Sequence, residues 1–272
     1  MTLAPTTHFP DRDKLSVATA AMAIAILSSH FVHLPGWQVT LRLPGLLLPL
    51  RMGMPGAMAL LIAALTIAGV DWILGDHPAL AGRSTLPHWL LPALTAWVLE
   101  VLLQHLPGGV AWWGIFFGGI ALWFLVMLAE YIVVDGEDLA YPLAATGLTA
   151  LGFLLFFLLA VAVRSSGLRL FFSAPMLGLA AGTVALRTFN LQLHGLWRPV
   201  EAIFILAIAT QLAAAFHYLP IPPAAYGLIL TAVTYAATIY IGNLLEEEPP
   251  SQAVVEPLIV LGLLLLLLPL AW

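Results

Sequence analysis

The chain has 272 residues, of which 62% are hydrophobic and only 8% are charged, with a formal net charge of -5. A soluble domain carries roughly 25% charged residues, so this composition excludes a soluble globular protein. A basic stripe that could neutralise phosphates is absent, which argues against a nucleic-acid partner. The chain has no cysteine, and this excludes disulfides, iron–sulfur clusters and thiolate metal sites.

Long apolar stretches follow one another almost without gaps along the chain. A bilayer core needs about 20 apolar residues per helix, so we predict an all-α polytopic transmembrane bundle of about nine spans, within a range of about eight to ten. Residues 1–14 are a polar tail, too polar for a signal peptide, and residues 15–272 are predicted to form one transmembrane helical domain. The predicted spans are residues 15–34, 54–74, 86–106, 109–129, 139–163, 168–186, 198–218, 223–243 and 252–271.

Residues 37–52 form an apolar stretch that is too short to cross a bilayer as a helix. Pro44, Gly45 and Pro49 interrupt it. Proline breaks helices, and irregular backbone is tolerated in membranes only where it is covered or lies at the interface. We therefore predict a short interfacial or re-entrant segment.

The seventh and eighth predicted spans form a hairpin around residues 219–223, and the second of them is unusually rich in small and hydroxylated residues. In lipid, such residues mediate close helix contacts, so they predict a helix-packing face and place the hairpin near the centre of the bundle. The residues of this face recur at three- and four-residue steps: Gly227, Thr231, Thr234, Tyr235, Thr238 and Gly242.

A carboxylate inside a predicted span is the sharpest single candidate for function. Glu100 lies about 9 Å inside the end of its span, where an unpaired carboxylate is costly and functional sites are overrepresented. It could carry protons, together with Gln211 and His217 of the hairpin. Alternatively, it bonds Gln104 one turn away and only fixes helix packing.

A second candidate is a face of acidic and basic residues predicted outside the spans. Carboxylates can hold a divalent cation and arginines can hold phosphate, which is the equipment of a lipid-phosphate enzyme. A solvated loop, with Arg198 and Glu201 paired one turn apart, explains the same charges. The residues of this face are Glu130, Asp135, Glu137, Asp138, Arg187, His194 and Arg198.

Histidines gather at the opposite predicted face, where His30, His33, His105 and His217 follow or end odd-numbered spans. Neutral imidazole ligates haem, chlorophyll or metals, but polar residues at helix ends account for them equally well. Cofactors therefore stay unknown, and the sequence indicates neither a metal site nor a catalytic residue. Lysine and arginine divide five to four between the faces, which leaves the orientation open.

Four short segments carry a resemblance to a family: residues 129–135 (AEYIVVD), 138–142 (DLAYP), 164–169 (RSSGLR) and 214–218 (AAFHY). In these segments the chain resembles an uncharacterised polytopic membrane family of Chloroflexi-type bacteria. The resemblance implies a multi-pass protein of the bacterial cytoplasmic membrane and an association with the photosynthetic or respiratory apparatus. It implies no catalytic residue.

Three functions stay open from the sequence. Small-residue faces and few intramembrane charges favour a non-enzymatic accessory, scaffold or assembly subunit, with the lipid bilayer and other membrane subunits as partners. The alternatives are a small-solute or lipid transporter using Glu100, Gln211 and His217, and a metal-dependent lipid-phosphate enzyme on the acidic face.

Overall fold

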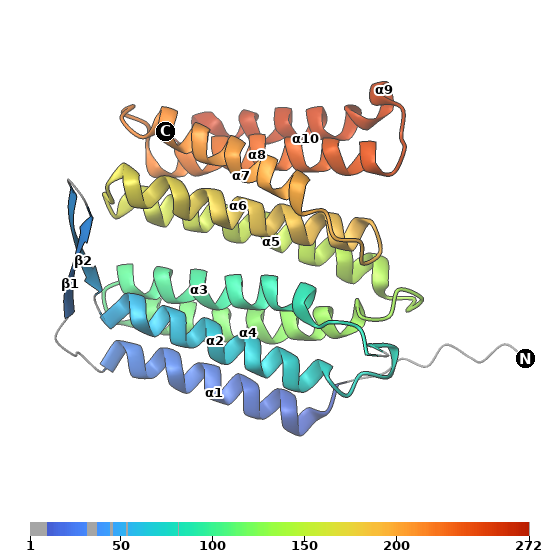
Figure 1. The fold of residues 1–272 in the computed structure, drawn as a ribbon, viewed down its shortest axis with the longest axis horizontal. Helices are drawn as coiled ribbons and strands as arrows, with labels where there is room; N and C mark the ends of the chain where they lie inside the picture. Colours follow the sequence, from blue (N-terminus) through green and yellow to red (C-terminus); the bar gives the residue numbers. More distant parts are fainter. Residues whose placement is uncertain (1–9, 32–36, 44–45, 53, 81, 272) are drawn as a thin grey trace, which may run out of the picture.

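The structure is a computed structural model, and it describes residues 10–31, 37–43, 46–52, 54–80 and 82–271. It confirms the predicted all-α bundle: long helices run side by side and alternate in direction (Figure 1). Within the described residues, eight helices are long and apolar enough to cross a membrane. The protein is therefore a multi-pass helical membrane protein.

The helices lie close to the predicted spans. The α-helices are α1 (Arg12–Phe31), α2 (Met54–Leu74), α3 (Leu90–His105), α4 (Val110–Ile132), α5 (Tyr141–Ser165), α6 (Leu170–Gln192), α7 (Pro199–Phe216), α8 (Pro223–Leu245), α9 (Pro250–Ala253) and α10 (Val255–Leu266). Short 3-10 helices are η1 (Pro78–Leu80), η2 (Leu86–Trp89) and η3 (Leu268–Ala271). Helix α2 matches the second predicted span, and its stretch Leu61–Leu74 is too short to count among the eight.

Two of the helices that extend beyond their predicted ends bring a buried charge into the helix. We ended the sixth span at residue 186, but α6 continues to Gln192, and α4 continues past residue 129 to Ile132. Arg187 and Glu130 therefore belong to helices, not to loops. The predicted spans stop short of Glu130 and Arg187; a charge facing lipid would be costly at these positions, but both charges are buried by neighbouring helices.

Residues 37–52 form a β-hairpin, with β1 (Trp37–Leu43) antiparallel to β2 (Leu46–Met52). Trp37 pairs with Met52 at the open end, and Leu43 pairs with Leu46 beside the turn. Figure 1 shows the hairpin at one end of the bundle, beyond the ends of the helices. The segment therefore adds no membrane-crossing helix, and an interfacial position for it stays a prediction.

The bundle has two hydrophobic cores, and α3 contributes to both. One core gathers α1, α2 and the outward faces of α3 and α4, and the other gathers α5 to α8. Leu91, Leu94 and Val98 of α3 pack into the second core, whereas Ala96 and Leu99 pack into the first. Figure 1 shows the same division, with α1 to α4 as one group of helices and α5 to α10 as the other.

The prediction that the α7–α8 hairpin is central is wrong for α7, whereas half of the apolar window of α8 is buried. Only 22% of the apolar window of α7 is buried, compared with 61% for Leu86–His105 and 56% for α6. The outward residues of α7 are apolar side chains such as Val200, Ile203 and Phe204, which lipid can solvate. The centre of the bundle is instead the seam where α3 meets α5 and α6.

The small residues of α8 lie against its neighbours. A Cβ on Gly227 would meet Val161 and Phe157 of α5, and one on Gly242 would meet the side chain of Gln192. Thr231, Thr234 and Thr238 are buried. Tyr235 donates a hydrogen bond to Glu256 of α10, 3.1 Å away.

Helices α6 and α7 approach each other closely at Gly178. A Cβ on Gly178 would collide with the hydroxyl of Thr210 and lie 3.2 Å from the carbonyl oxygen of Leu206. Gly178→Ala should therefore push α7 away and lower stability by about 1–3 kcal/mol. Thermal unfolding in a mild detergent measures this.

Gly147→Ala in α5 is the matched control, since nothing lies within 4 Å of the added Cβ. It should leave stability unchanged or raise it by about 0.5–1 kcal/mol, because glycine is a poor helix former. Equal melting temperatures for the two variants would contradict the close packing of α6 on α7.

Candidate functional site

Four elements meet at the end of the bundle opposite the β-hairpin. Helix α4 ends there, α5 begins there, α6 ends there, and the η1–η2 segment leads into α3 (Figure 1). Each of these elements carries a polar side chain into the same region, namely Glu130, Tyr141, Arg187 and His88. This is the end at which the sequence placed its acidic and basic face.

A buried ion pair joins α4 to α6. The Arg187 guanidinium donates from Nε to Glu130 Oε1 over 3.2 Å and from Nη2 to Glu130 Oε2. Arg187 is 1% exposed and Glu130 is fully buried. The two-pronged geometry matches the planar guanidinium to the carboxylate, and this makes the pair strong as well as directional.

His88 of η2 joins the same carboxylate. Its Nδ1 lies 2.8 Å from Glu130 Oε2. An ionised carboxylate can only accept, so we assign the proton of the imidazole to Nδ1. Glu130 Oε2 thus accepts from both His88 Nδ1 and Arg187 Nη2, which lie 3.3 Å apart, so the three side chains form one network through the carboxylate. Through Glu130, this network ties η2 and α3 to α4 and α6.

Asn190 lies one turn beyond Arg187 on α6 and completes the network. Its Oδ1 accepts a hydrogen bond from Arg187 Nη1. The Nδ2 of the same amide is buried and has no partner among the described residues. A buried donor without a partner costs about 1–3 kcal/mol, so this amide edge is a natural contact for a ligand or water.

The end of α6 positions a further histidine. His194 has a φ of +51°, and the N–H of Gly195 (φ +97°) bonds the carbonyl of Asn190 at 2.8 Å, which is the Schellman pattern of helix termination. The His194 ring stacks on Tyr141, with ring centres 5.4 Å apart, and Tyr141 donates to the carbonyl of Leu191 over 2.7 Å. The turn after α6 is therefore fixed to the start of α5.

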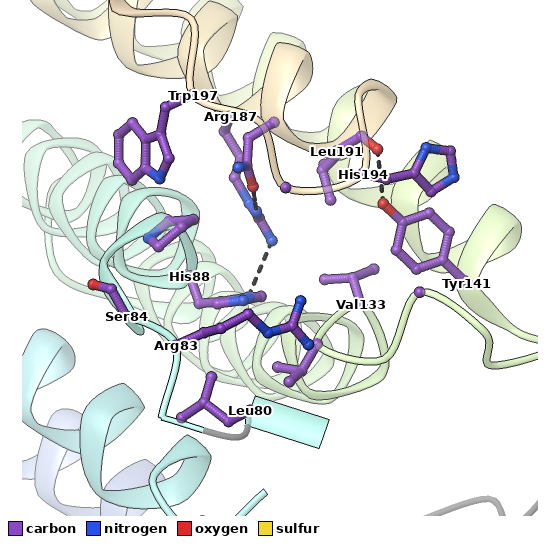
Figure 2. A pocket seen from close by; sticks show the side chains of 15 residues that line it. Leu80, Arg83, Ser84, His88, Val133, Tyr141, Arg187, Leu191, His194 and Trp197 are labelled. Atoms are coloured by element: carbon purple, nitrogen blue, oxygen red, sulfur yellow. Dashed lines mark hydrogen bonds between the residues drawn. The ribbon is translucent and has the colours of Figure 1, made fainter. Parts of the chain in front are cut away.

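These side chains line a cavity of about 190 Å³. His88, Arg187 and Asn190 are buried and form its floor, whereas Arg83 and His194 are exposed at its rim. Figure 2 shows Arg83, His88 and Arg187 directed toward one space, with His194 and Tyr141 on its far side. Among the described residues, the lining contains two arginines and two histidines and no carboxylate. The cavity is therefore lined by cations and hydrogen-bond donors.

The other acidic residues of the predicted face serve the chain turn between α4 and α5. Asp135 Oδ1 accepts from the N–H of Glu137 at 3.0 Å, and Asp138 Oδ1 accepts from the N–H of Ala140 at 2.8 Å. Arg198 pairs with Glu201 at 3.8 Å, as its spacing predicted. The predicted face thus divides into a buried network around Glu130 and Arg187 and separate local contacts.

The predicted intramembrane residues Glu100, Gln211 and His217 lie in different surroundings. Glu100 is 1% exposed, accepts a hydrogen bond from Gln104 over 2.8 Å and lies beside Ser29 and His30 of α1. His217 instead contacts Ser173 of α6, 3.4 Å away, and Gln211 is exposed on α7. The described contacts do not join these residues into one site.

The remaining histidines show no metal-binding arrangement in the part of the chain that the structure describes. No group of three or more His, Asp or Glu side chains there could hold a metal ion. His30, His105 and His217 lie at the helix ends near the β-hairpin, as predicted (Figure 1). His33 lies outside the described residues.

Among the cavity residues that the sequence interpretation did not name as candidates are His88, Asn190 and Arg83. His88 stands two residues into a predicted span, in the polar break Pro87-His88-Trp89 of an otherwise apolar run. A histidine inside a span is a signal of function by the same argument that selected Glu100. Arg83 and Asn190 stand in segments where loop charges are ordinary, so sequence gave no comparable signal for them.

The Glu130–Arg187 pair generates a prediction about stability. Arg187→Gln leaves a buried carboxylate without its cation and should cost about 3–5 kcal/mol. Glu130→Gln should cost a similar amount, but the double variant should be less destabilised than the sum of both, because neither charge is then left alone. Thermal unfolding of the three variants in detergent measures the coupling.

Arg198→Gln is the control, since its partner Glu201 is partly exposed and such a pair contributes only about 0–1 kcal/mol. Strictly additive losses in the double variant would show that Glu130 and Arg187 do not stabilise each other.

Comparison with known proteins adds a family but no activity. No curated protein matches the chain, and no solved structure matches it. One protein family does match, over residues 34–271, and it is described as a protein of unknown function (DUF5656). This match spans most of the chain and includes every residue of the cavity, so the protein belongs to the DUF5656 family.

Proposed function

We propose that the protein is a non-enzymatic, multi-pass membrane protein that binds an anionic group, a phosphate or carboxylate, in the Arg187 cavity. The observation that carries this proposal is the lining: two arginines, two histidines and the unpartnered Nδ2 of Asn190, with no carboxylate. Arginine is the side chain best suited to hold phosphate or carboxylate, because its N–H donors match the oxygen geometry.

Contacts within the protein do not use all the N–H donors around the cavity. Arg187 uses three of its five N–H groups for Glu130 and Asn190. Glu130 neutralises the Arg187 charge, so the exposed Arg83 supplies the net positive charge that attracts an anion. The cavity of about 190 Å³ is much larger than the space one water needs, so it has room for several waters or for a phosphate.

The geometry supports binding better than the lipid-phosphate enzyme. A divalent cation that holds phosphate is itself held by carboxylates, and no carboxylate lines the cavity. Asp135 and Asp138 direct oxygens to backbone N–H groups of their own turn. A transporter built on Glu100, Gln211 and His217 gains no support either, because these residues have different neighbours.

The proposal includes a location and a setting. The resemblance to a Chloroflexi-type family supports the bacterial cytoplasmic membrane. The outer sides of α7 and α10 support contacts with lipid or with other membrane subunits, since only 22% and 11% of their apolar windows are buried. We propose that the protein acts there as an accessory or assembly subunit that carries a bound anionic ligand.

The test is calorimetric titration of the detergent-solubilised protein with sn-glycerol 3-phosphate, a soluble anion. Arg83→Gln should weaken binding about tenfold, since a hydrogen bond to a charged group contributes about 1.5–3 kcal/mol. Asn190→Asp should weaken it at least as much, because it replaces a donor by a negative charge while leaving Arg187 a partner.

The matched control is Arg198→Gln, which removes an arginine on the same side of the molecule but outside the cavity lining. Binding that is absent in the native protein, or that falls equally in Arg198→Gln and Arg83→Gln, would refute the cavity as an anion site.

A further inference from the structure

An apolar groove runs beside the cavity along α2, α3 and α6. Its volume is about 530 Å³, and none of the described side chains that line it is charged. The small side chains of alanines on α2 and α3 leave space for the groove, and larger side chains form its walls. The lining includes Ala63, Ile67, Trp89, Ala93, Leu179 and Thr183.

The groove and the cavity lie on the two sides of the short helix η2. Leu86 and Trp89 line the groove, whereas the two residues between them, Pro87 and His88, line the cavity. At η2 the groove and the cavity are therefore separated by no more than about one helical turn.

Helix α6 makes a second connection. Leu179 and Thr183 line the groove, and Arg187 lines the cavity. These residues recur every four positions, so they follow one stripe of the helix and span about 12 Å along its axis. A molecule that lies along this stripe passes from apolar surroundings to the guanidinium within its own length.

We propose that the ligand is a membrane phospholipid with an anionic headgroup, whose phosphate occupies the Arg187 cavity and whose acyl chain lies in the groove. This inference rests on the anion binding proposed above and specifies the class of ligand. The apolar groove borders helices at membrane depth, and the cavity lies at the end of those helices, which is the arrangement of chain and headgroup in a lipid.

Trp89, where the groove meets the cavity, supports the assignment of a phospholipid. Its indole Nε1 is buried and has no partner among the described residues, although its ring lines the groove. The indole ring is apolar except at its N–H edge, and this N–H usually finds an acceptor when it is buried. The ester and phosphate oxygens of a phospholipid place acceptors at the level where chain and headgroup meet.

The experiment titrates the detergent-solubilised protein with dioleoyl phosphatidic acid or dioleoyl phosphatidylcholine and counts bound lipid by native mass spectrometry. Phosphatidic acid should bind at least tenfold more tightly than phosphatidylcholine. Ala93→Phe on α3 and Thr183→Phe on α6 fill the groove from two sides, and each should weaken phosphatidic acid binding at least tenfold. Both should leave sn-glycerol 3-phosphate binding unchanged, since it needs only the cavity.

The matched control is Ala121→Phe, which adds the same ring to an exposed position of α4 outside the groove. It should change neither titration, and thermal unfolding verifies that all variants are folded. Arg83→Gln should weaken both phosphatidic acid and glycerol phosphate.

The two proposals fail in different ways. Unchanged phosphatidic acid binding in folded Ala93→Phe and Thr183→Phe, or equal binding of phosphatidylcholine, would overturn the lipid assignment while glycerol phosphate still bound the cavity. Absence of glycerol phosphate binding in the native protein would instead overturn the anion site itself.

Discussion

The buried contact between Glu130 and Arg187 decides how the ends of four elements meet. Because neither charge has access to water, each needs the other, and their two-pronged geometry fixes α4 relative to α6. His88 binds the same carboxylate and adds η2 and α3 to this arrangement. The ion pair thus fixes the floor of the cavity, whereas connecting segments contribute to its rim.

A membrane protein of this composition could be held together without that pair. Apolar side chains of similar volume often replace a buried ion pair at no loss of stability, so stability alone gives no reason to keep two charges in this position. Charged groups inside spans are rare and mark functional sites more often than apolar positions do. The Nδ2 of Asn190 beside the pair is also buried without a partner among the described residues, and this leaves a donor that a ligand or water can use.

Much of the fold could be predicted from the sequence, because lipid demands about 20 apolar residues per helix and leaves a clear pattern. The site could be predicted only in part. Glu130 and Arg187 fall on the same face by counting spans, but their pairing depends on how α3 and α5 bring the ends of α4 and α6 together, which no local pattern encodes. His88 was hidden inside an apolar run, and the carboxylates of Asp135 and Asp138 proved to bond their own turn. The position of the α7–α8 hairpin could not be predicted for a similar reason. Its polar residues indicate that it contacts other helices, but they do not indicate on how many sides other helices bury it.

The position of the groove follows from the same division of the bundle. The first four helices and the later helices build separate cores that meet mainly through α3 and α4. Helices α2 and α6 belong to different cores, and both border α3. The alanines of α2 and α3 have small side chains, so an apolar groove stays open between these helices. The ion pair closes this seam at one end and places a cation-lined cavity there. A ligand with an apolar tail and an anionic head fits such a seam because each of its parts meets the surroundings that its chemistry requires.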